Sequence, residues 1–153
     1  MLIQFTVGNF KSFKDKATLS LEATHDDWRE DDNLAHLPNQ RLVKAAAIYG
    51  PNAGGKSNFL AAMVQFRELI KESSKDTQKD EPIRVTPFRL HSSTEAAPSF
   101  FEAVFLHKGT RYRYGFEQAQ MIFVRPSVCW VKSKGWRERI LLSQHRQVDW
   151  ARR

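Results

Sequence analysis

An eight-residue run at positions 50–57 has residue types and spacing suited to binding phosphate. Its sequence, Gly-Pro-Asn-Ala-Gly-Gly-Lys-Ser, matches the phosphate-loop pattern G-x-x-x-x-G-K-[ST]. Glycines let the backbone curl so that successive N–H groups point at phosphate oxygens. Lys56 would reach the β- and γ-phosphates of a nucleotide, and the Ser57 hydroxyl would bind a Mg²⁺ ion that bridges them. The run therefore predicts a site for a nucleoside triphosphate with Mg²⁺.

The segments on either side of this run have the patterns that such a loop requires. Residues 42–49 form a nearly continuous apolar run, which predicts a strand buried on both faces of a parallel or mixed sheet. After the loop, apolar residues recur at helical spacing and predict an amphipathic helix: Phe59, Met63, Phe66 and Ile70. The positive N-terminus of that helix would face the phosphates. The alternative is a glycine-rich β–α turn with an incidental lysine, which the flanking patterns disfavour.

The N-terminal third is predicted to be mostly β. Residues 2–8 alternate apolar and polar side chains, which predicts a strand with one buried face. A turn over residues 9–15 and a second strand over residues 17–21 would complete a hairpin. The acidic stretch 25–33 is predicted to be a solvated loop.

The second half of the chain is also predicted to be β, after a surface loop. Residues 71–82 contain no apolar side chain apart from Pro82, which predicts a mobile loop. Residues 100–106 and 110–116 predict a hairpin with a turn at 107–109, in which aromatic residues alternate with Arg111 and Arg113. Further short strands are predicted at 121–124, 128–131, 137–142 and 148–150.

The composition is that of a globular domain. The chain has 153 residues, is 41% hydrophobic and has a mean hydropathy of −0.53, without an apolar run long enough to span a membrane. The first residues lack the features of a signal peptide. The single cysteine, Cys129, excludes an internal disulfide and fits a reducing, cytoplasmic compartment. The five histidines lack ligand spacing, so no zinc site is predicted.

The net charge of +7 lies entirely in the last third. Residues 1–100 carry 13 basic and 13 acidic side chains, whereas residues 101–153 carry 11 and 4. Two interpretations stay open: a nucleic-acid surface with stacking tryptophans, or a sheet face that packs on an acidic partner surface. The residues concerned are Arg111, Arg113, Lys132, Lys134, Arg137, Arg139, Trp130 and Trp136.

Several segments together resemble a known family. IQFTVGNFKSFKD, TLSLEA and AAAIYGPNAGGKSNFLAAM resemble the N-terminal half of an ABC-type ATPase head of the SMC/RecF/OLD kind, in particular bacterial AAA family ATPases of toxin and anti-phage defence systems. TPFRL, PSFFEAVFL and RYRYGFE also resemble this family, so the likeness covers most of residues 1–118. Ala53-Gly54-Gly55 departs from the usual Gly-Ala-Gly or Ala-Ser-Gly, but small residues are retained.

The resemblance implies an α/β fold, the N-terminal lobe of a P-loop NTPase. It would have a mixed sheet with the phosphate-loop helix and an antiparallel β subdomain, and would be mostly β after residue 84. The predicted division is a P-loop core with the N-terminal hairpin at 1–73, a mobile loop at 74–84 and the β subdomain at 85–153. The implied ligands are ATP and Mg²⁺, with Ser57 on the metal. The implied nucleotide-binding residues are Gly50, Pro51, Asn52, Ala53, Gly54, Gly55, Lys56, Ser57, Asn58, Lys11 and Ser12, the last two in a turn that could instead be merely exposed.

Two motifs needed for hydrolysis are missing from the sequence. No apolar strand ends in Asp-Glu, which would hold Mg²⁺ and activate water, and no L-S-G-G-Q-like signature occurs. Gln118 and Gln120 are candidates for a glutamine that senses Mg²⁺, but both are equally consistent with turn residues. In relatives the missing elements lie in the C-terminal half, and two heads dimerise around the nucleotides. We therefore expect ATP binding with hydrolysis dependent on a missing C-terminal half or a homodimer partner. The alternatives are a DNA- or RNA-binding module with a vestigial loop and, disfavoured, a complete small P-loop kinase or GTPase.

Overall fold

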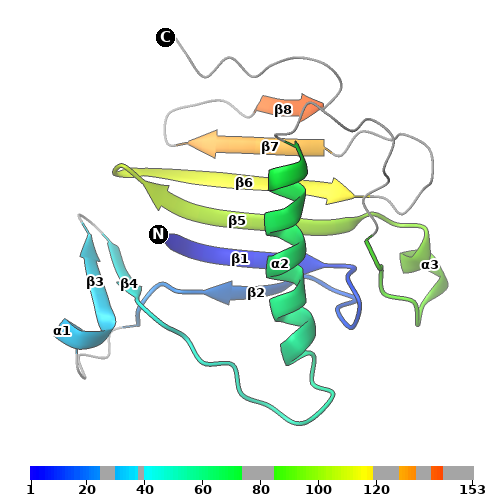
Figure 1. Cartoon of the computed structure of the whole chain (residues 1–153), viewed down its shortest axis with the longest axis horizontal. Coiled ribbons are helices and arrows are strands. Elements are labelled where there is room, and N and C mark those ends of the chain that lie inside the picture. Colours follow the sequence, from blue (N-terminus) through cyan, green and yellow to red (C-terminus); the bar gives the residue numbers. More distant parts are fainter. Residues whose placement is uncertain (25–29, 38–39, 74–84, 119–127, 134–138, 143–153) are drawn as a thin grey trace.

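One antiparallel sheet crossed by a single long helix makes up most of the structure (Figure 1). The computed structural model describes residues 1–24, 30–37, 40–73, 85–118, 128–133 and 139–142, the last two segments by their backbone alone. Six described strands form the sheet in the order β2-β1-β5-β6-β7-β8. Their bounds are β1 Leu2–Gly8, β2 Ala17–Ser20, β5 Ser99–His107, β6 Thr110–Gln118, β7 Val128–Ser133 and β8 Arg139–Leu142. The other elements are α1 Glu30–Asn33, β3 Leu34–Leu37, β4 Gln40–Val43, α2 Lys56–Ser73 and α3 Ser92–Glu95.

The N-terminal hairpin forms as its alternating pattern predicts. β1 pairs antiparallel with β2 on one edge and with β5 on the other. Phe5 and Val7 point to the face that α2 covers and are buried there. Thr6 lies on the opposite face, where its hydroxyl is 2.9 Å from the Thr18 hydroxyl of β2. β1 is thus an interior strand of the sheet with two different faces.

The β5–β6 hairpin confirms the second predicted β unit. The two nine-residue strands pair from His107↔Thr110 to Ser99↔Gln118. Lys108 and Gly109 connect them with φ angles of 47° and 76°, as a two-residue hairpin turn with two left-handed residues requires. β7 and β8 extend the sheet beyond β6, confirming strands within 128–131 and 137–142. The predicted strands at 121–124 and 148–150 lie outside the described residues.

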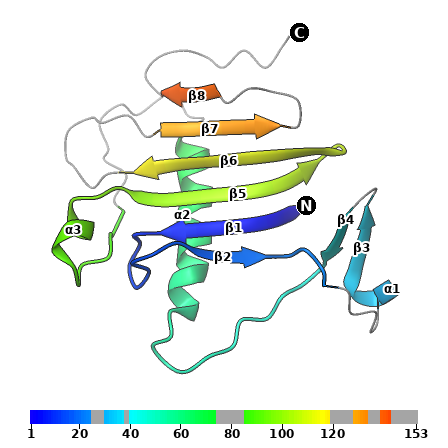
Figure 2. The same cartoon turned by 180° about the vertical axis from the view of Figure 1, so that it is seen from behind.

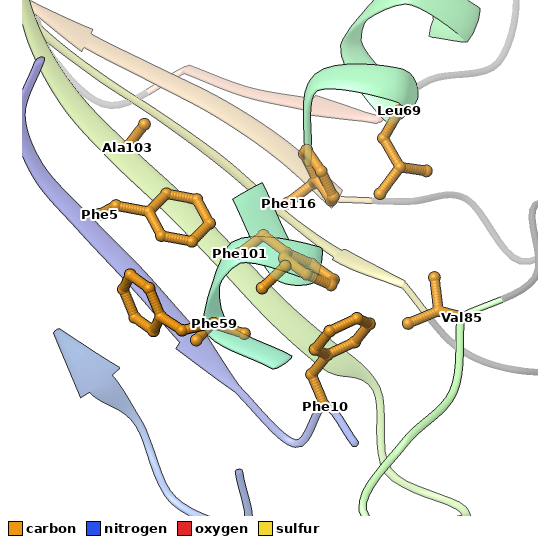
Figure 3. Packing of buried hydrophobic residues seen from close by; sticks show 10 residues of the cluster. Phe5, Phe10, Phe59, Leu69, Val85, Phe101, Ala103 and Phe116 are labelled. Atoms are coloured by element: carbon orange, nitrogen blue, oxygen red, sulfur yellow. The ribbon is translucent and has the colours of Figure 1, made fainter. Parts of the chain in front are cut away.

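Helix α2 packs on the sheet through an aromatic cluster (Figure 3). The ring centroids of Phe59 and Phe5 lie 5.6 Å apart with their planes at 87°, the edge-to-face arrangement that aromatic quadrupoles favour. Phe66 stacks on Phe116 of β6 at 5.3 Å. The predicted apolar stripe is correct up to Phe66, but Ile70 is 38% exposed and Leu69 is buried in its place. The inward face continues from Phe66 to Leu69 because a three-residue step keeps the side chain over the sheet.

The predicted buried strand at residues 42–49 is wrong. Only its first two residues belong to a strand, β4, and residues 44–50 are irregular and exposed. Ile48 is 40% exposed and Tyr49 is 89% exposed. A strand buried on both faces needs packed elements over both of them, and beyond Val43 no described strand pairs with this segment. All described strand pairings are antiparallel, so the expected mixed sheet is corrected to an antiparallel one.

A small hairpin that the sequence analysis did not predict covers part of the opposite face. β3 and β4 pair antiparallel, and Leu42 of β4 is buried with Ile3 and Val104 of the large sheet. Figure 2 shows this hairpin beside one end of the sheet, whereas α2 crosses the sheet near its centre. The available signal was two short apolar-containing runs separated by Pro38 and Asn39. The hairpin follows α1, whose four residues lie within the stretch 25–33 that was predicted to be an acidic loop.

Two remaining predictions concern segments between these elements. α2 continues to Ser73, so the start of the predicted loop at 71–82 is helical, and residues 74–84 lie outside the described residues. The predicted domain division stays a prediction, and the large sheet takes strands from both sides of it. No helix in the described segments has both the length and the apolar character needed to cross a bilayer.

Candidate functional site

The glycine-rich run forms an exposed loop that leads directly into α2. Within it, the Gly54 N–H donates to the Pro51 carbonyl over 3.2 Å. The first helical hydrogen bond runs from the Phe59 N–H to the Gly55 carbonyl over 2.9 Å. N–H groups in the first turn of a helix have no partner inside the helix. The loop and the start of α2 thus present several backbone donors and the positive helix end at one place.

Lys56 folds back over the loop that precedes it. Its Nζ donates to the carbonyls of Gly50 and Pro51, over 2.7 Å and 2.6 Å. These two hydrogen bonds hold the ammonium group against the backbone at the start of the loop. The side chain is therefore in position to exchange carbonyl partners for phosphate oxygens.

Gly55 lies in close contact with the turn after β1. Its φ of 87° is in the left-handed region that favours glycine. A Cβ on Gly55 would also meet the Ser12 Oγ at 3.1 Å and the Phe13 Cζ at 3.4 Å. The backbone conformation therefore favours glycine, and a Cβ here would force the Ser12 or Phe13 side chain to shift by a few tenths of an ångström.

The turn that contains Lys11 and Ser12 is held to α2 by a side-chain hydrogen bond. The Phe10 and Phe13 N–H groups each donate to the other's carbonyl, which closes the turn. The Asn58 Nδ2 then donates to the Ser12 Oγ over 2.9 Å. Of the predicted site residues, the structure thus brings Ser12 to Asn58 and to Gly55. Lys11 is exposed in the same turn, with its Nζ 5.5 Å from the Phe10 ring centroid.

Asn9, the residue immediately before this turn, was not among the site residues predicted from the sequence. Asn9 is 8% exposed and has a φ of 47°. Its amide nitrogen donates to the carbonyls of Thr94 and Ala97, each over 2.8 Å, and its amide oxygen accepts from the Phe88 N–H over 3.0 Å. The sequence places Asn9 in a predicted turn, where asparagine is common, so nothing in the pattern indicates its role.

The loop, the helix and most of the sheet fall within one region of similarity to known proteins. Residues 45–150 match the family model described as "AAA domain, putative AbiEii toxin, Type IV TA system". The chain belongs to this AAA-domain family. No curated protein matches the sequence. Family membership indicates nucleotide binding, and the matched region of this AAA domain includes the whole phosphate loop.

Ser57 is the predicted metal ligand of this AAA domain. Ser57 is exposed in the first turn of α2, beside the loop. Among the described residues, no group of three or more His, Cys, Asp or Glu side chains could hold a metal ion. One hydroxyl is suited to Mg²⁺ only if phosphate oxygens supply further ligands. Gln118 ends β6, and Gln120 lies outside the described residues.

The described part of the basic last third is partly neutralised by ion pairs. An Arg111 nitrogen lies 3.5 Å from a Glu22 carboxylate oxygen, and the Arg113 Nε lies 3.7 Å from Glu102. Both arginines face away from α2, as the alternation in β6 predicts. Trp130, Lys132 and Arg139 lie in strands whose side chains are not described. Lys134, Trp136 and Arg137 lie outside the described residues.

Proposed function

We propose that this AAA domain is the ATP-binding lobe of an SMC/RecF/OLD-like ATPase, with residues 50–58 as its phosphate site. The observation that carries the proposal is the position of Lys56, held against the start of a glycine-rich loop at the N-terminus of an 18-residue helix. Backbone N–H groups, a helix N-terminus and an ammonium group together favour a polyphosphate over a monovalent anion. The likeness of the sequence around the loop to such ATPases supports ATP as the nucleotide.

Each loop residue has a distinct part in the proposed site. Lys56 binds the β- and γ-phosphates, and Ser57 binds Mg²⁺, which when bound offsets the charge of the phosphates. The remaining residues contribute backbone donors or shape: Gly50, Pro51, Asn52, Ala53, Gly54, Gly55 and Asn58. Lys11 and Ser12 approach the α-phosphate or the sugar from the N-terminal turn, a role supported by the contact between Ser12 and Asn58.

ATP hydrolysis by this lobe is proposed to need a C-terminal half or a partner head. The sequence has no Asp-Glu pair after an apolar strand and no signature motif, and both are needed for turnover in such enzymes. The exposed apolar segment before the loop supports this proposal, because Ile48 and Tyr49 would be buried if a further strand paired with them. A head-to-head homodimer, a defence or toxin system and a cytoplasmic location belong to the same proposal.

Replacing Lys56 by Ala tests the nucleotide site. The ammonium group makes charge-assisted contacts with phosphate worth about 3 kcal/mol, so we expect Mg-ATP binding to weaken about 100-fold. Titration calorimetry of the whole chain with ATP and Mg²⁺ measures this. Lys71→Ala is the matched control, since Lys71 is exposed in the last turn of the same helix and pairs with Glu68. Absence of ATP binding by the unaltered chain, or unchanged binding by Lys56→Ala, would contradict the proposal.

Titrating the same variants with duplex DNA or RNA tests the alternative of a nucleic-acid-binding module. Under that alternative, duplex DNA or RNA would bind with an affinity that falls steeply with salt and is indifferent to ATP and to Lys56→Ala. The ion pairs of Arg111 and Arg113 with acidic side chains do not favour it. An acidic protein surface is the partner that we propose for the basic last third.

A further inference from the structure

We propose that Asn9 is a positioning residue for the nucleotide site, an inference that rests on the proposed ATP binding. Asn9 has a buried side chain, and both the nitrogen and the oxygen of its amide form hydrogen bonds. The nitrogen faces three carbonyls, those of Thr94, Ala97 and Pro98, at 2.8, 2.8 and 3.3 Å. The oxygen accepts from the Phe88 N–H at 3.0 Å. No other side chain of this size offers donors on one end and an acceptor on the other, so the site requires an asparagine.

These bonds fix the turn to the segment before β5. The Asn9 main-chain carbonyl accepts a hydrogen bond from the Ser99 hydroxyl at the start of that strand. Two residues later, the Lys11 N–H donates to the Thr86 carbonyl over 2.9 Å. Residues 86–99 therefore hold both the start and the middle of the turn in place. Because Asn9 is buried, side-chain rearrangement there would leave several polar groups without partners.

The turn in turn contacts the phosphate loop. Ser12 accepts from the Asn58 amide of α2, and its hydroxyl limits the space beside Gly55. Asn9 itself donates to and accepts from residues 88–99, none of which belongs to the loop. Its effect on a nucleotide would therefore be indirect, through the position of Ser12. We infer that the nucleotide site includes a supporting layer formed by Asn9 and residues 86–99.

Replacing Asn9 by Gly separates the side-chain bonds from the backbone conformation. Glycine adopts the left-handed φ of 47° without cost and removes all four side-chain contacts. We expect Mg-ATP to bind about tenfold more weakly, the usual effect of removing a partner that orients a contacting group. Calorimetry is carried out well below the melting temperature of each variant, so that only folded protein is compared. Thr6→Val is the matched control, because Thr6 is 6% exposed and hydrogen-bonded to Thr18 on the far face of the sheet.

A double-mutant cycle that combines Asn9→Gly with Ser12→Ala distinguishes a positioning role of Asn9 from a merely structural one. If Asn9 acts through the turn, the double variant binds Mg-ATP no more weakly than the weaker single variant. Effects that multiply, or a folded Asn9→Gly variant that binds as the unaltered chain does, would overturn the inference. Failure of the unaltered chain to bind ATP would overturn the proposed function instead.

Ser99→Ala keeps the inference testable if Asn9→Gly does not fold. This change removes only the bond from the Ser99 hydroxyl to the Asn9 carbonyl. We expect binding of Mg-ATP to weaken about threefold, less than for Asn9→Gly because one bond is lost. A folded Ser99→Ala variant with unchanged affinity would count against a positioning role for this layer.

Discussion

Gly55 and Gly109 share a left-handed backbone but differ in their surroundings. Their φ angles are 87° and 76°. A Cβ at Gly55 would press on Ser12, whereas a Cβ at Gly109 would meet nothing within 4 Å. At the residue scale, therefore, one glycine serves the hairpin turn alone, and the other also allows two segments of the candidate site to approach closely.

Replacing Gly55 or Gly109 by Ala separates the cost of a left-handed backbone from the cost of a steric contact. A left-handed alanine costs about 1–2 kcal/mol, partly offset by a less flexible unfolded chain. For Gly109→Ala we expect a loss of about 1 kcal/mol in the free energy of unfolding and unchanged ATP affinity. Gly55→Ala should lose more stability and bind Mg-ATP at least about tenfold more weakly, because Ser12 must move. Urea denaturation and calorimetry measure the two effects, and equal ATP affinity in both variants would contradict this account.

Helix α2 is the element that joins the candidate site to the core. Its N-terminus carries the phosphate loop, and its inner face packs on the sheet through Phe59 and Phe66. Its outer face has an apolar part near the N-terminus and a charged part near the C-terminus. Leu60 and Val64 are 58% and 51% exposed, whereas Arg67 and Lys71 further along pair with Glu68. At the element scale, the packing of α2 onto the sheet positions the loop against the N-terminal turn.

Neighbouring residues of α2 should respond very differently to truncation. Phe59 is 7% exposed and contacts Phe5 and Phe13, so Phe59→Ala should lower the free energy of unfolding by about 3–4 kcal/mol. Leu60→Ala, one position further on, should lower it by less than about 0.5 kcal/mol because the side chain is largely exposed. Chemical denaturation of both variants measures the difference. A large effect of Leu60→Ala on the isolated chain would mean that the outer face of α2 is already covered.

In the part of the chain that the structure describes, a buried core lies between the sheet and α2, and other apolar side chains are exposed. The antiparallel sheet and α2 enclose the main core, in which Phe5, Phe10 and Phe101 are almost completely buried (Figure 3). In contrast, the extended segment before the phosphate loop is exposed, including Ile48 and Tyr49. Exposed apolar side chains on a segment and a helix that adjoin a binding loop are typical of interaction surfaces. We propose that a second copy of this chain packs against this side of the molecule.

Polar substitution of Leu60 and Val64, on the outer face of α2, tests this proposal through its effect on self-association. Without nucleotide, we expect the unaltered chain to self-associate at high concentration, since burial of Leu60 and Val64 is favourable. Leu60→Gln combined with Val64→Gln should reduce the association constant at least about tenfold without lowering the free energy of unfolding. Sedimentation velocity measures the association, with Lys71→Gln as a polar control on the same helix. Equal self-association of all three proteins would rule out this face as the contact.

The sequence by itself was sufficient for the main strands, for α2 and for the predicted chemistry of the loop. Alternation with period two predicted β1 and β6, and the runs at residues 17–21 and 100–106 predicted β2 and β5. Helical spacing predicted α2, and the spacing of glycines, Lys56 and Ser57 indicated a phosphate site. These features depend only on residues that are close in the sequence, so they can be predicted from the sequence directly.

Tertiary structure alone decided which segments meet. Apolar character predicted a buried strand at residues 42–49, but a strand needs partners from elsewhere in the chain, and no described strand pairs with residues 44–49. The contact of Ser12 with Asn58 and the bonds of Asn9 to residues 88–98 join segments separated by 46 to 89 residues. A sequence pattern does not encode such contacts, because they arise when α2 and the segment before β5 both pack against the turn that follows β1. The residues proposed to bind phosphate can therefore be predicted from the sequence, while those proposed to hold them in place are apparent only from the fold.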